Sequence, residues 1–217
     1  MFYTKKRFRS KYVNVKEPRM KQEKFETILD IAKKMFARYG LRKTSMDELA
    51  RMARVAKATI YNYFGSKDKV YMEVLRRESD EVVEKLSSSV AGKSSPKDKL
   101  MTFARAKFHY MRRAVNLLNL DREGRGKSLP AAEEIRNQFF EREVDIIRSI
   151  LKEGVEEGVF HLKDVLLTAR AIGHALRGFE VNWLVQENEE QIDHYLDELM
   201  NILFYGLMSE KISLTKV

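Results

Sequence analysis

Apolar residues recur with a helical period along most of this chain, and this pattern constrains its fold more than any other feature. One stripe of apolar residues continues over five turns between positions 165 and 183. Only three prolines occur in 217 residues, at positions 18, 96 and 130, and each lies near an expected helix boundary. No segment has the alternating pattern of a convincing strand. The sequence therefore predicts an all-α protein.

Capping signals mark the start and end of the first helices. One helix keeps its apolar period from Phe25 to Tyr39 and is expected to end at Gly40. Ser45 and Glu48 then have the spacing of a capping box, in which each side chain bonds the other residue's backbone amide. This spacing predicts that a short helix begins at Ser45.

Two further helices are expected directly afterwards. A second short helix covers positions 57–64 and ends at Gly65. Ser66 can cap a long helix that continues to about residue 88. The serine-rich segment 87–96 is expected to be a connection between helices.

Charge is distributed unevenly along the chain. Residues 1–70 contain 19 Lys and Arg but only 7 Asp and Glu, a net charge of +12. Residues 71–217 contain 22 basic and 25 acidic residues, a net charge of −3. A basic block of this kind suits a polyanionic partner, although a solvated basic surface explains the charge alone equally well.

Several classes of protein are not supported by the composition. The chain has no cysteine, which excludes disulfides and thiolate metal sites and fits a reducing cytoplasm. No window approaches the 18 consecutive apolar residues of a membrane span, and the basic N-terminus has no apolar signal region. The four histidines lack metal-binding spacing, and no nucleotide-binding or hydrolase motif occurs. We expect a cytoplasmic protein with no metal, no cofactor and no catalytic residues.

The strongest functional signal lies in residues 44–67, TSMDELARMARVAKATIYNYFGSK. Two short helices separated by a few residues have the arrangement of a helix-turn-helix, whose second helix enters the major groove of DNA. Ile60 and Phe64, four residues apart, can hold that second helix on the core while its polar residues face outward. An ordinary helical hairpin with a polar face is the alternative explanation of this spacing.

The wording of this segment favours the first interpretation. Residues 25–75 resemble the DNA-binding domain of the TetR family of bacterial regulators, most specifically in the run K-A-T-I-Y-N-Y-F-G-S-K at 57–67. Outside that run, the resemblance rests on Ile31, Ala32, Phe36, Gly40, Thr44, Leu49, Ala50, Val55 and Val70.

The resemblance implies a domain organisation and a set of DNA contacts. Residues 1–18 show no sustained period and are expected to be a flexible basic arm. The resemblance implies a three-helix helix-turn-helix domain at 19–66 and a helical domain for effector binding and dimerisation at 67–217. Contacts to base edges are implied for Lys57, Ala58 and Asn62. Contacts to phosphates are implied for Thr59, Tyr61, Tyr63 and Lys67, and for Thr44 and Ser45 at the start of the preceding helix.

Two positions depart from the family pattern. The turn commonly reads Gly-Val-Ser in the family, whereas this chain has Arg54, Val55 and Ala56. Arg54 stands where a positive φ is often required, so we expect a strained or altered turn. Ala56 lacks the hydroxyl that would cap the second short helix.

The remaining helices supply candidates for effector binding and dimerisation. Large apolar residues of the central helices are candidates to line an effector site, although such residues more often form plain core: Phe103, Phe108, Met111, Phe140, Phe179 and Trp183. The apolar stripes that pass through Trp183 and Leu203 are the expected homodimer contact.

Together with the resemblance, these observations predict a transcriptional repressor that a small, largely apolar effector releases from a palindromic operator in double-stranded DNA. An all-helical enzyme and a helical adapter that binds a protein partner are the alternatives. The basic arm, with Lys5, Lys6, Arg7, Arg9 and Lys11, either follows the DNA or is only a solvated segment.

Overall fold

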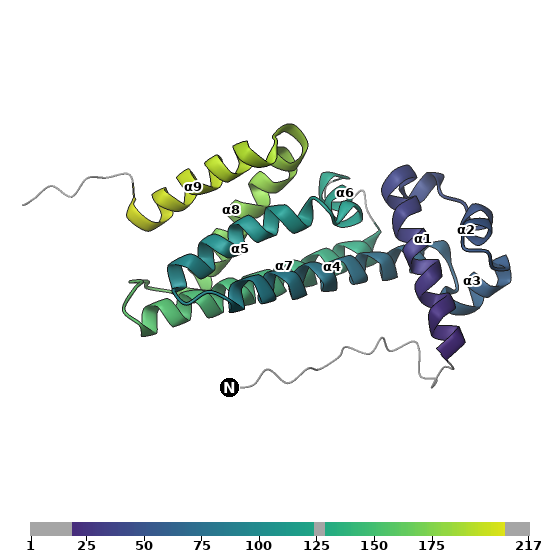
Figure 1. Cartoon of the computed structure of the whole chain (residues 1–217), viewed down its shortest axis with the longest axis horizontal. Helices are drawn as coiled ribbons and strands as arrows, with labels where there is room; N and C mark the ends of the chain where they lie inside the picture. Colours follow the sequence, from purple (N-terminus) through teal and green to yellow (C-terminus); the bar gives the residue numbers. More distant parts are fainter. Residues whose placement is uncertain (1–18, 124–128, 207–217) are drawn as a thin grey trace, which may run out of the picture. The chain divides into compact units, whose positions relative to one another are not determined.

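The computed structural model describes residues 19–123 and 129–206, and the helices within these ranges confirm the all-α prediction. Figure 1 shows them in chain order. Their bounds are α1 (Arg19–Lys43), α2 (Met46–Met52), α3 (Lys57–Phe64), α4 (Lys67–Ala91), α5 (Pro96–Met111), α6 (Val115–Glu123), α7 (Pro130–Glu156), α8 (Val165–Gln186) and α9 (Glu189–Tyr205).

The chain divides into two compact units, Met1–Val70 and Tyr71–Val217. The boundary falls within the first turn of α4, so this one helix has residues in both units. The basic arm expected at residues 1–18 lies outside the described residues.

The first unit is built on a small core that α1, α2 and α3 share. Ile28, Leu49 and Ile60, one from each helix, have no exposed surface. The ring of Phe25 stacks on that of Phe64 with 4.9 Å between centroids, which ties α1 to α3. This core fixes the position of α3 relative to α1 and α2.

The first helix is longer than its apolar period predicts. It begins at Arg19, six residues before Phe25. Exposed polar residues at 22–24 extend the helix without an apolar period. Its regular part ends at Gly40 as expected, since Gly40 has φ 76° and ψ 166°, and a short helical segment follows to Lys43.

The second unit is organised around α5, which packs against α6, α7, α8 and α9. Leu100, Phe103, Lys107 and Met111 form a fully buried row along α5. Helices α7 and α8 have the most extensive contact of any pair, and Gly173 of α8 makes it possible: a Cβ there would lie 3.2 Å from the Phe140 ring.

The expected connection at 87–96 is wrong over its first half. Helix α4 continues to Ala91, because the Ser88 hydroxyl donates a hydrogen bond back to the Glu84 carbonyl and Val90 is buried. The connection covers only residues 92–95, and the Ser95 hydroxyl caps α5 by accepting a hydrogen bond from the Asp98 amide.

Among the helices that the structure describes, none is both long enough and apolar enough to cross a membrane.

Candidate DNA-binding surface

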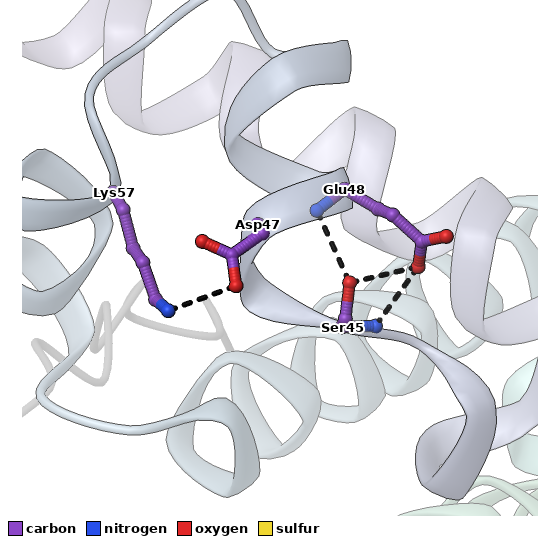
Figure 2. Close-up of polar contacts among 4 residues, drawn as sticks. All are labelled: Ser45, Asp47, Glu48 and Lys57. Atoms are coloured by element: carbon purple, nitrogen blue, oxygen red, sulfur yellow. Dashed lines mark hydrogen bonds and ion pairs between the residues drawn. The ribbon is translucent and has the colours of Figure 1, made fainter.

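The start of α2 is fixed by the capping box that the sequence predicts. The Glu48 amide donates to the Ser45 hydroxyl oxygen at 3.2 Å, and the Ser45 amide donates to the Glu48 carboxylate at 3.3 Å (Figure 2). The Ser45 hydroxyl also donates to the Glu48 carboxylate at 2.8 Å, and this bond, together with the one from the Ser45 amide, lowers the pKa of Glu48. The first turn of α2, which includes Asp47, therefore has a well-defined backbone.

The turn between α2 and α3 has the strained residue and the missing N-cap hydrogen bond that the sequence predicts. Arg54 adopts φ 54°, in the left-handed region, which is energetically unfavourable for a residue with a Cβ. Its side chain is exposed. Ala56 occupies the N-cap of α3 with an extended backbone and makes no side-chain capping bond. The helix thus begins without one of the usual stabilising contacts.

Helix α3 has one face on the core and one face in solvent. Ile60 and Phe64 are buried, as predicted from their spacing. Lys57, Ala58 and Asn62 are exposed, and Tyr61 keeps 43% of its surface. All three predicted base-reading side chains therefore lie on the accessible side of the helix, with Tyr61 beside them.

Lys57 has a partner that sequence reasoning missed. Its Nζ lies 2.9 Å from Oδ2 of Asp47, which projects from the first turn of α2 (Figure 2). The hydrogen bond and the charge of Asp47 raise the pKa of Lys57. The two residues are ten apart on different helices, so no periodicity could have paired them.

Three of the predicted phosphate contacts also hold the first unit together. Thr44 is 2% exposed, and its hydroxyl donates to the Gly40 carbonyl at 2.9 Å. The Lys67 ammonium donates to the Thr44 carbonyl at 3.1 Å, directly after the last residue of α1. The Tyr63 ring lies in an edge-to-face pair with Phe25, with 6.0 Å between ring centroids, and is half-buried. Of these three, Thr44 is the one whose side chain is closed off from a ligand.

Comparison with known proteins bears on the same residues. The family model described as bacterial regulatory proteins, tetR family, matches residues 28–74, which span α1 to the first turns of α4. These residues of the chain are therefore similar to the DNA-binding part of TetR-family regulators. The match includes every residue of the helix-turn-helix and the whole exposed face of α3.

Similarity to known regulators extends beyond the helix-turn-helix. The fatty acid metabolism regulator protein of Bacillus subtilis (strain 168) is 22% identical over 191 residues, covering 87% of this chain and 98% of its own length. The repressor KstR2 of Rhodococcus jostii (strain RHA1) is 25% identical over 189 residues, covering 84% and 90%. The crystal structure of the transcriptional regulator FadR from Bacillus subtilis in complex with stearoyl-CoA is 21% identical, covers 85% of this chain and all of that one, and has a TM-score of 0.70. The described fold is thus similar to that of this regulator over most of the chain.

The second unit brings most of the predicted effector residues together. Trp183 of α8 stacks on Phe179 at 4.7 Å and meets Phe108 of α5 at 5.3 Å. Phe103 and Met111 of α5 have no exposed surface. Phe140 of α7 is also buried, but its ring partner is His174 at 4.5 Å.

A buried ion cluster lies on the same three helices and was missed by sequence reasoning. Lys107 of α5 bonds Glu143 of α7 at 2.5 Å and Glu180 of α8 at 3.0 Å, with each side chain at most 3% exposed. Burial alone would lower the pKa of Lys107, but the two carboxylates outweigh it and raise the pKa. A charged residue between Phe103 and Met111 in an apolar i, i+4 row was the available signal.

A pocket of about 270 Å³ lies at the opposite end of this unit. Its floor includes Leu100 and Ile172, and its rim includes Lys97, Leu203 and Tyr205. None of the six predicted effector residues lines it.

Proposed function

We propose that the protein is a sequence-specific DNA-binding repressor of transcription. It binds an inverted-repeat operator as a homodimer and leaves the operator when a small, largely apolar effector binds. The single observation that carries the proposal is α3, whose inner residues Ile60 and Phe64 are buried while Lys57, Ala58 and Asn62 are exposed. Because operator DNA is its target, the protein acts in the cytoplasm.

The exposed face of α3 has the chemistry to read bases. The Asn62 amide can donate to N7 and accept from N6 of one adenine, and the Lys57 ammonium can donate to O6 and N7 of guanine. Ala58 has no side chain beyond Cβ, so the helix backbone can approach the base edges closely.

Phosphate contacts surround this face and position it. Tyr61 and Thr59 present hydroxyls beside the base-reading residues, and Ser45 lies at the start of α2. Tyr63 and Lys67 contribute through the part of each side chain that the core does not use. Thr44 acts indirectly, because its buried hydroxyl supports the chain just before α2. The net charge of +12 on residues 1–70 adds attraction to any duplex.

The homodimer forms through α8 and α9. One recognition helix reads only a few base pairs, which gives too little affinity on its own, and a two-fold dimer doubles the contacts. These two helices carry most of the large apolar side chains that the single chain leaves exposed, namely Leu166, Leu167, Phe179, Tyr195, Ile202, Leu203 and Tyr205. Trp183 lies beside Phe179 and Tyr195 and continues this surface toward the core.

The effector site lies between α5, α7 and α8, lined by the six residues that the sequence predicts. Phe108, Phe179 and Trp183 form a continuous aromatic row there. Because Phe103 and Met111 are fully buried, an effector must separate α5 from α8 to reach them. The stearoyl-CoA in the FadR crystal supports an effector with a long apolar part.

Helix α4 is the covalent connection through which ligand binding in the second unit affects α3. Its first turn belongs to the first unit, and it ends in the second unit. A ligand shifts the protein off DNA only if it binds more tightly to the conformation that spaces the two recognition helices wrongly.

Selection of duplexes from a random pool tests the proposal. We expect the protein to enrich one inverted repeat, with affinity that falls steeply as salt rises because phosphate contacts release counterions. Stearoyl-CoA should release the enriched duplex, whereas coenzyme A alone should not. Recovery of unrelated sequences would contradict the proposal and favour an enzyme or an adapter, neither of which needs an operator.

A further inference from the structure

The ion pair between Asp47 and Lys57 joins the two helices of the helix-turn-helix. Asp47 projects from α2 and Lys57 is the first residue of α3, and the pair measures 2.9 Å. Both side chains are well exposed, at 74% for Asp47 and 46% for Lys57. A negative charge thus lies next to a lysine that is proposed to face DNA.

The two partners differ in how firmly they are held. Asp47 lies in the first turn of α2, where the Ser45–Glu48 capping box fixes the backbone on either side of it. Lys57 has a flexible four-carbon stem, and its ammonium acts as a mobile point charge. Asp47 is therefore the fixed member of the pair, and it determines where the Lys57 ammonium lies.

We propose that Asp47 is a specificity-determining residue that directs Lys57 to a base edge and away from the phosphate backbone. The inference rests on the proposed DNA-binding function. An ammonium has three donors, so Lys57 can keep one bond to Asp47 and still donate two to the O6 and N7 of guanine. The Asp47 carboxylate also repels phosphates, which weakens contacts that any sequence could make.

Without Asp47, Lys57 is free to reach the nearest phosphate. The Asp47→Asn variant keeps the size of the side chain and removes its charge. We expect it to bind scrambled duplexes about three- to fivefold more tightly, the change that an exposed ion pair of ordinary strength corresponds to. Affinity for the selected duplex should rise less, so the ratio of specific to nonspecific affinity falls.

The salt dependence gives a second, independent readout. One additional phosphate contact by Lys57 should steepen the slope of log affinity against log salt by about 1. Asp30→Asn is the matched control, because it removes the same charge from an exposed position on α1. A thermal melt of each variant verifies that the first unit remains folded.

The experiment measures wild type, Asp47→Asn and Asp30→Asn on the selected duplex and on a scrambled duplex of the same composition, each with and without Lys57→Met. The proposal expects a loss of discrimination and a steeper slope only for Asp47→Asn, and only when Lys57 is present. Equal effects of both Asn variants, or an effect of Asp47→Asn that survives Lys57→Met, would overturn it. If the wild type enriches no duplex at all, the DNA-binding function itself is wrong.

Discussion

Asn62 is the residue at which recognition of the DNA sequence can be tested most directly. Its side chain is exposed on α3, one position after Tyr61, on the face opposite buried Ile60 and Phe64. An amide can pair with adenine in two hydrogen bonds, whereas the Tyr61 hydroxyl can only donate to or accept from a neighbouring group such as a phosphate. Substitutions of these two adjacent residues are therefore expected to affect DNA binding in different ways.

We expect Asn62→Ala to lose about 1–3 kcal/mol of discrimination at one base pair of each half-site. Tyr61→Phe should instead weaken binding to all sequences by a similar factor. Titration of each variant against the selected duplex and its single-base-pair substitutions measures both effects. An unchanged base preference in Asn62→Ala would show that Asn62 does not read a base.

Arg54 gives a residue-scale prediction about stability. Its φ of 54° costs a residue with a Cβ about 1–2 kcal/mol, whereas glycine adopts it freely but loses more chain entropy on folding. We expect Arg54→Gly to raise the free energy of unfolding by about 0.5–1 kcal/mol, measured by urea denaturation. Arg51→Gly, inside α2, is the control and should lower it by about 1 kcal/mol. A loss of stability in both variants would show that Arg54 makes a contact worth more than its strain.

The residue-scale predictions from sequence succeed where local geometry decides the outcome. The spacing of Ile60 and Phe64 fixes which way α3 faces, and the position of Arg54 in a turn indicates its φ. The roles of Thr44 and Lys67 in closing α1 could not be read from sequence, because they depend on a carbonyl that only the folded chain brings near.

At the scale of elements, α3 is a short helix that begins without a side-chain cap. Its N-cap Ala56 has the extended backbone, φ −67° and ψ 143°, that a capping residue requires, but it has no acceptor. We expect Ala56→Ser to raise the free energy of unfolding by about 1 kcal/mol, because a hydroxyl there can accept from an amide in the first turn.

Denaturant unfolding of the full chain measures the effect of Ala56→Ser. Ser45→Ala is the matched control, since it removes from α2 the kind of cap that the first variant adds to α3, and it should cost about 1 kcal/mol. If Ala56→Ser has no effect while Ser45→Ala destabilises, the start of α3 is held by its contacts with the core.

Helix boundaries were predictable where a cap marks them and not elsewhere. Ser45, Gly65 and Ser66 each mark a boundary at which the structure has one. The end of α4 was wrong because its serines satisfy the helix backbone, and Val90 gains burial by remaining helical. Serine-rich composition alone does not distinguish a capped connection from a helix end packed on its neighbours.

At the scale of the whole molecule, the charge difference between the two parts of the chain agrees with a division of roles. The basic block coincides with the unit that contains the helix-turn-helix, and the second unit contains most of the acid. The sequence could not reveal that Lys107, Glu143 and Glu180 meet inside the second unit, because they come from three helices. The effector site proposed above therefore lies beside a buried ion cluster and has a partly polar surrounding.

The homodimer is the prediction that depends on the whole molecule. We expect the wild type to sediment at micromolar concentration with twice the 25.5 kDa mass of the chain. Leu203→Glu places a charge among the exposed apolar residues of α9, which should raise the dissociation constant of the dimer by at least about tenfold. Met52→Glu is the control, because Met52 is similarly exposed, at 56% against 43%, but lies on α2.

The Leu203→Glu variant also separates dimerisation from DNA contact. If operator binding requires two recognition helices at a fixed spacing, Leu203→Glu should weaken binding to the full inverted repeat while leaving binding to a single half-site unchanged. A wild-type protein that remains at 25.5 kDa, or a Leu203→Glu variant that stays dimeric, would contradict the assignment of α8 and α9 as the interface. A monomer with full operator affinity would go further, because one copy of α3 would then have to supply the whole of the sequence recognition.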